Sequence, residues 1–148
     1  MKKYLVFLAS ALVLFSVFGL WESFSQAQTI KIKSAVFDRV ELADTEAKRI
    51  LGLSGRESLD ERQAMLFVFG EPEIPQMWMK DMRFPLDIIW IDERLRIAHI
   101  TRNALPESYP SIFEPPAPVK YALEINAGLA DAYELDVGDL VEMNFYFR

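Results

Sequence analysis

The residues with the greatest potential for chemistry lie in one segment, residues 77–92, where charged side chains interrupt two apolar, aromatic-rich runs. Lys80, Asp81 and Asp87 stand within this segment, and Pro85 restricts the backbone between the two runs. Removing an unpaired charge from water is costly, so a carboxylate on an apolar strand must reach solvent or find a partner. The segment therefore predicts either a ligand site or a buried ion pair.

Groups of the same kind come from a separate expected strand, which contains Lys120 and Glu124. In a shared pocket, Trp78 would stack on a ring of the ligand. Lys80 and Lys120 would offset its charges, while Asp87 and Glu124 would accept its hydrogen bonds. We therefore predict a site for a small polar ligand, a carbohydrate or an organic acid, that binds without catalysis.

Two alternatives use the same residues. In the first, the charges form ion pairs that brace the fold, and the chain is a structural or protein-interaction domain of the cell envelope. In the second, Asp87 and Glu124 act as paired carboxylates in the hydrolysis of a glycosidic bond. This hydrolase requires both carboxylates to face one substrate, and a separation of 37 positions in sequence does not establish that.

Most other chemistries have no support in the sequence. The chain has no cysteine, which excludes disulfides, thiol nucleophiles and Cys-ligated zinc. Its single histidine, His99, lies in an apolar run, and no serine stands in a nucleophile elbow. Met77, Met79 and Met82 carry thioethers of the kind that bind Cu(I), but methionine is also a common core residue, which we take as the better interpretation. We predict no metal site and no cofactor.

The elements that must position these residues are short strands, indicated by apolar runs between turns. Strands are expected at 30–32, 36–42, 64–69, 86–91, 95–101, 120–126 and 141–147, with 36–42 either one bent strand or two, and 77–80 as a short extended segment. Short helices are expected at 44–51 and 129–134. This order predicts an α+β fold of mainly antiparallel strands, about seven in number, in a curled sheet or a small, partly open barrel with one or two short helices.

The first helix has a recognisable start and end. Asp44 is the expected N-cap, and Gly52 ends the helix. Ala47, Ile50 and Leu51 form an apolar stripe, which we expect to pack against the sheet because a two-turn helix is not stable alone.

A proline-rich loop spans residues 103–118, with five prolines that exclude a central strand. It carries Tyr109 and Phe113. The loop either roofs a pocket or crosses the domain and covers its core.

The N-terminus predicts an address. Residues 4–21 contain no charge, follow two lysines and precede a small-residue pattern that ends at Ala27. This is typical of an export signal at residues 1–27, and the run is also long enough for a membrane anchor. We therefore expect an exported protein, periplasmic or extracellular or anchored by residues 4–21, with a single domain at residues 30–148.

The charge balance restricts the partners. The net charge is −6 at pH 7, and nucleic acids select basic surfaces, so we expect no nucleic-acid partner. Contact with a membrane is expected only through an uncleaved N-terminal segment. The oligomeric state stays open.

A series of short motifs carries a resemblance to a known family. The motifs are Gly52-Leu53 with Arg56, Met65–Phe69, Trp78-Met79-Lys80, Pro85-Leu86-Asp87, Lys120-Tyr121, Leu123-Glu124, Gly128 and Gly138-Asp139. In this order they resemble the prokaryotic domain-of-unknown-function family 192, over roughly residues 36–143. The resemblance implies a mainly β domain without an established activity. It also adds Arg56 to the candidate ligand-binding residues, which already include Asp81 from the charged segment.

The chain departs from the family pattern in three places. Asp81 and Met82 stand where the family tends to have Asn and Thr, Ser54 where it tends to have Met, and Ala64 where it tends to have Gly. Aspartate in place of an amide removes a donor and adds a charge, which would change how Asp81 contacts a ligand.

Overall fold

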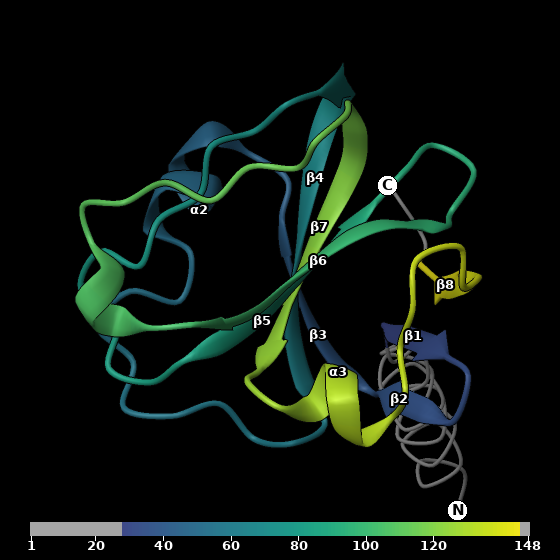
Figure 1. The fold of residues 1–148 in the computed structure, drawn as a ribbon, viewed down its shortest axis with the longest axis horizontal. Helices are drawn as coiled ribbons and strands as arrows, with labels where there is room; N and C mark the ends of the chain where they lie inside the picture. Colours follow the sequence, from purple (N-terminus) through teal and green to yellow (C-terminus); the bar gives the residue numbers. More distant parts are fainter. Residues whose placement is uncertain (1–27, 146–148) are drawn as a thin grey trace, which may run out of the picture.

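A five-stranded sheet is the centre of the domain (Figure 1). The computed structural model describes residues 28–145. The strands lie in the order β3 (Arg39–Ala43), β4 (Gln63–Glu73), β7 (Val119–Asn126), β5 (Leu86–Ile91) and β6 (Ile97–Ala104). The pair β3 and β4 is parallel, whereas the other neighbours are antiparallel. The predicted hairpin after residue 91 is confirmed by the β5–β6 pair.

A second, three-stranded antiparallel sheet contains β2 (Ala35–Phe37), β1 (Thr29–Ile32) and β8 (Val141–Asn144), in this order. Neither sheet closes into a barrel, and the predicted α+β, mainly antiparallel class is confirmed. The prediction of a strand at 36–42 resolves into two strands, because β2 and β3 join different sheets. Both strands still contribute to one core cluster, through Ala35 and Phe37 of β2 and Val40 of β3.

Two α-helices and one 3-10 turn complete the described part: α2 (Glu46–Leu51), α3 (Leu129–Ala132) and η1 (Pro106–Ser108). The predicted cap of α2 is wrong, because the Thr45 side chain accepts from the Lys48 amide, while Asp44 pairs with the Lys48 ammonium at 2.7 Å. Gly52 ends α2 at φ +49°, a conformation that favours glycine.

The predicted packing of the α2 stripe is also wrong. No residue of α2 is buried, and Ile50 and Leu51 are 59% and 63% exposed. Of this stripe, Ile50 and Leu51 line a cavity. The helix is joined to the sheet by the Arg49 guanidinium, which donates to the Val68 carbonyl of β4 at 3.0 Å.

The five-stranded sheet is covered on both faces. All six residues of β5 are buried, as predicted for its continuous apolar run. One face contributes Ile89 and Ile91 to a core with the small sheet. The other contributes Ile88 and Trp90 to a core that the long loops cover. The sheet thus separates two apolar clusters.

The segment after β4 is irregular. Met77 forms an isolated bridge with Phe113 of the proline-rich loop, so residues 77–80 are not a strand in a sheet. The predicted alternation is nevertheless confirmed: Met77 and Met79 are buried, whereas Trp78 and Lys80 are exposed. The loop therefore covers the core through Phe113 and fixes the position of Trp78.

Residues 1–27 lie outside the described part of the chain, and the expected signal or anchor lies there. Within residues 28–145, no helix is long and apolar enough to span a membrane. The expectation of export remains a prediction.

Candidate functional site

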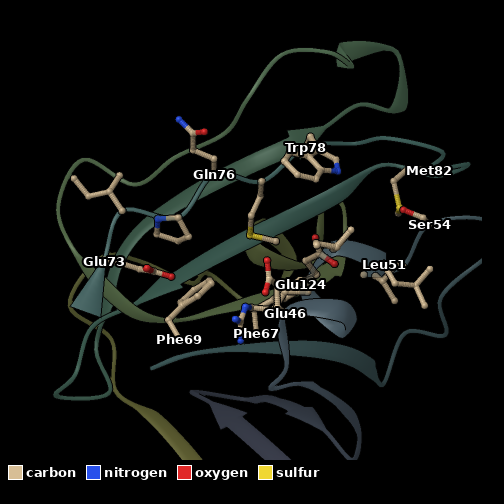
Figure 2. A pocket seen from close by; sticks show the side chains of 17 residues that line it. Glu46, Leu51, Ser54, Phe67, Phe69, Glu73, Gln76, Trp78, Met82 and Glu124 are labelled. Carbon is tan, nitrogen blue, oxygen red and sulfur yellow. The ribbon is translucent and has the colours of Figure 1, made fainter. Parts of the chain in front are cut away.

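A cavity of about 410 Å³ opens on one face of the five-stranded sheet (Figure 2). Its walls come from α2, from residues 73–78, which begin at the last residue of β4, and from Ser54 and Met82. Phe67 and Phe69 of β4 and Glu124 of β7 line it from the sheet. Sites for small molecules typically have volumes of about 300–1,000 Å³, so the cavity is large enough for one.

Glu124 is the distinctive residue of this cavity. It lies opposite Met65 of β4 and Ile88 of β5, in the middle of the sheet, and only 5% of its surface is exposed. Its Oε2 atom has no hydrogen-bond partner in the described structure. Burial raises the pKa of the Glu124 carboxyl to about 8, and the nearby Arg56 guanidinium acts in the opposite direction. At neutral pH the group is therefore mostly a neutral acid.

Arg56 approaches this carboxyl but is bound elsewhere. Its guanidinium donates two hydrogen bonds to Glu41 of β3, at 2.5 and 2.8 Å. This bidentate bond lowers the pKa of the Glu41 carboxyl and raises that of Arg56. Arg56 thus acts on Glu124 through its charge and does not occupy the free Oε2 atom.

Trp78 stands at the mouth of the cavity. Its side chain is 40% exposed and lines the opening, while its neighbours Met77 and Met79 are buried. In the view of Figure 2, Trp78 lies on the side opposite Phe67 and Phe69, with Glu124 between them. A flat or ring-shaped group entering the cavity would therefore meet an aromatic side chain before it reached the carboxyl.

Lys80 and Asp81 have backbone roles. The Lys80 carbonyl accepts from the Ser54 hydroxyl at 2.9 Å, and the Asp81 carbonyl accepts from the Gly55 amide at 2.8 Å. Asp81 adopts φ +56°, a region in which Asn and Asp are several-fold enriched. The residue type at position 81 is thus explained by the turn, and these bonds join residues 54–55 to the segment that carries Trp78.

Asp87 lies away from the cavity. It pairs with Ile125 across β5 and β7, whereas Glu124 pairs with Ile88, so the two carboxyls are on opposite faces of the sheet. Asp87 is 1% exposed and accepts hydrogen bonds from the backbone amides of Asn103, Gly128 and Ala130 at 2.8–3.0 Å. The paired arrangement that a hydrolase would need is not formed.

Lys120 also has a local role, because its ammonium donates to the Gly70 carbonyl and lies outside the cavity lining.

Of the seven predicted site residues, the structure brings together Trp78 and Glu124 in the cavity, with Arg56 close to Glu124. Lys80, Asp81, Asp87 and Lys120 do not line it. Two of the predicted residues therefore share one site, and the others make separate contacts within the fold.

Sequence reasoning missed several cavity residues. Phe67 and Phe69 were assigned only to a strand, although the period of two places them on the same face as Met65, opposite which Glu124 lies. Glu46, Arg49 and Glu73 carry the charges of the wall. An apolar stripe on a helix too short to be stable was the one available signal that α2 borders an opening.

The contacts of Lys80 lead to a first prediction. Among the described residues its ammonium has no ion-pair partner, and the side chain is exposed. Lys80→Met should therefore change Tm by less than about 2 °C in a thermal unfolding experiment. A much larger loss would show that Lys80 braces the fold; Arg83→Met, which removes an exposed pair with Glu57, is a matched control.

Comparison with protein-family models identifies the fold and its relatives. The model of the uncharacterised family DUF192, described as "Uncharacterized ACR", matches residues 28–143. The chain belongs to the DUF192 family. No curated protein matches the chain.

Two solved structures are similar to this DUF192 chain. A protein of unknown function from Novosphingobium aromaticivorans is 32% identical with a TM-score of 0.73, and the match covers 77% of this chain and 83% of that one. A "putative transcription regulator" from Sinorhizobium meliloti is 35% identical with a TM-score of 0.73, and the match covers 78% of this chain and 92% of that one. The family assignment thus fixes the fold and names no reaction.

Proposed function

We propose that this DUF192 domain binds a small polar ligand in the Glu124 cavity without catalysing a reaction on it. The observation that supports this function most is the free Oε2 atom of a carboxyl that is almost completely buried at a cavity. Buried polar atoms nearly always have hydrogen-bond partners, and each exception needs an explanation. A ligand that bonds to Oε2 supplies the missing partner.

A carbohydrate fits the lining better than an organic acid does. Glu46, Glu73 and Glu124 contribute three carboxyls, against the single guanidinium of Arg49. An anionic ligand would meet like charges on the wall, and its negative charge would oppose ionisation of Glu124. Sugar hydroxyls both donate and accept hydrogen bonds, as a neutral carboxylic acid does, and sugar rings stack on indole faces such as that of Trp78.

The proposal is tested by isothermal titration calorimetry of the purified full chain with neutral mono- and disaccharides. Trp78→Ala should weaken binding of the sugar at least about tenfold, because it removes the aromatic side chain at the mouth. Tyr109→Ala removes an exposed aromatic side chain outside the cavity lining and should leave the affinity unchanged. Equal affinity in the wild-type and Trp78→Ala proteins would contradict the proposed site.

A protein-interaction domain remains the second candidate, because three apolar side chains at the cavity wall are at least half exposed: Ile50, Leu51 and Ile74. Exposed apolar patches can mark interfaces. This candidate predicts that no sugar binds, while Ile50→Lys abolishes association with a protein partner and leaves Tm unchanged.

The proposed localisation and partners are argued from the sequence alone. We propose that residues 1–27 direct export or form an anchor, which N-terminal sequencing of the exported protein would test. The description of the Sinorhizobium relative as a transcription regulator is not extended to this chain, since a net charge of −6 does not favour binding to nucleic acid.

A further inference from the structure

The charges around the cavity are unequal. Three glutamates line it, of which Glu124 is mostly neutral, and Arg49 is the only Lys or Arg residue among the lining residues. The Arg49 guanidinium already donates to the Val68 carbonyl at 3.0 Å, so part of its donor capacity is used within the fold. A positively charged ligand group would therefore be attracted to this cavity, and a negatively charged group would be repelled.

Glu124, the most buried of these carboxyls, has no hydrogen bond from a cation. Arg56 is the nearby cation, and its Nη1 and Nη2 atoms donate to Glu41 and not to Glu124. Glu124 Oε2 thus remains without a donor, although it is buried and borders the cavity. A neutral carboxyl both donates and accepts hydrogen bonds, so a donor or an acceptor could pair with Oε2, and a charged donor would favour the ionised form of Glu124.

We propose that the ligand presents an ammonium group to Glu124 and is an amino sugar, not a neutral sugar. The inference rests on the proposed function, because it assumes that a sugar occupies the cavity. The ammonium would donate a hydrogen bond to Oε2, and the sugar ring would lie toward Trp78 at the mouth.

This contact requires a proton to move. Before binding, Glu124 is mostly protonated, since burial raises its pKa to about 8. An ammonium at Oε2 stabilises the carboxylate, so the carboxyl proton leaves to the solvent as the ligand enters. The other charged groups around the cavity are Glu46, Arg49 and Glu73 on its wall and Arg56, bonded to Glu41, beside it. A neutral sugar would leave the proton on Glu124.

The test compares three sugars that differ only at carbon 2: glucosamine, glucose and N-acetylglucosamine. Each is titrated calorimetrically into the full chain at about pH 6.5, where the carboxyl of Glu124 is mostly neutral, in two buffers with different heats of ionisation. Glucosamine should bind about tenfold more tightly than the two neutral sugars, as expected for one charge-assisted hydrogen bond in a partly dry site. Its binding should also release close to one proton, and that of the others close to none.

Glu124→Gln provides the matched variant, because it keeps the size and the neutral hydrogen-bonding groups. It should abolish both the preference for glucosamine and the proton release. The proton count in the wild-type protein is independent of how this variant folds. Glu46→Gln, on the cavity wall, should retain the proton release.

The outcomes separate the two proposals. If glucose and glucosamine bind equally tightly and release no proton, the amino-sugar inference is overturned and the proposed function stands. If no sugar binds, both are overturned.

Discussion

Replacing Asp87 with asparagine is expected to lower the free energy of unfolding by about 3 kcal/mol. Its two carboxylate oxygens accept three backbone hydrogen bonds, one from Asn103 and two from Gly128 and Ala130. In either orientation, the asparagine amide would turn an NH₂ group toward at least one of these N–H donors. Because the site is 1% exposed, water cannot replace the lost bond without opening the structure.

Urea denaturation of the wild-type and variant proteins measures this loss. Asp44→Asn is the matched control, since Asp44 is exposed and its partner is the Lys48 ammonium. Its effect should be small beside that of Asp87→Asn. If the two substitutions had equal effects, the three backbone hydrogen bonds to Asp87 would not stabilise the fold as argued. Because Asp87 does not line the cavity, sugar affinity at a temperature where the variant is folded should stay unchanged.

Much of the fold could be predicted from the sequence, because strand periodicity survives in the final structure. The apolar run at 86–91, the alternation at 120–126 and the hairpin between residues 91 and 97 are all local patterns. The parallel pairing of β3 with β4 and the separation of β2 from β3 are decided by contacts far apart in sequence. Local patterns do not specify such contacts, and this is why one bent strand and two strands could not be told apart.

The site was less predictable, because charge alone does not reveal which face a residue occupies. Asp87 and Glu124 are both carboxyls on apolar strands, and both were expected to accept hydrogen bonds from a ligand. The register places Asp87 opposite Ile125 and Glu124 opposite Ile88, which separates their roles. Backbone amides from β6 and from the start of α3 satisfy Asp87, and no pattern in the sequence shows where such amides will lie.

The buried carboxyl of Glu124 predicts the pH dependence of stability. Its pKa is about 8 in the folded protein, against 4.5 for an ordinary glutamate, so the folded state binds more protons than the unfolded state between these values. The contribution of Glu124 to the free energy of unfolding is therefore fully present below about pH 4.5 and is lost as the pH rises through about 8. The integrated loss is on the order of 5 kcal/mol, because each unit of pKa difference corresponds to about 1.4 kcal/mol.

Glu124→Gln should remove this loss, since glutamine has no charge to bury. Urea unfolding at intervals between about pH 4.5 and 9 gives the free energy for both proteins, and their difference cancels every titrating group they share. The free energy of unfolding of the variant should rise steadily relative to that of the wild type up to about pH 8, and the difference should then stay constant. Glu142→Gln, at an exposed glutamate of β8, controls for the loss of any acid. Parallel curves for the wild type and Glu124→Gln would mean that Glu124 gains a partner or water on folding, which would also remove the vacant Oε2 atom on which the ligand site depends.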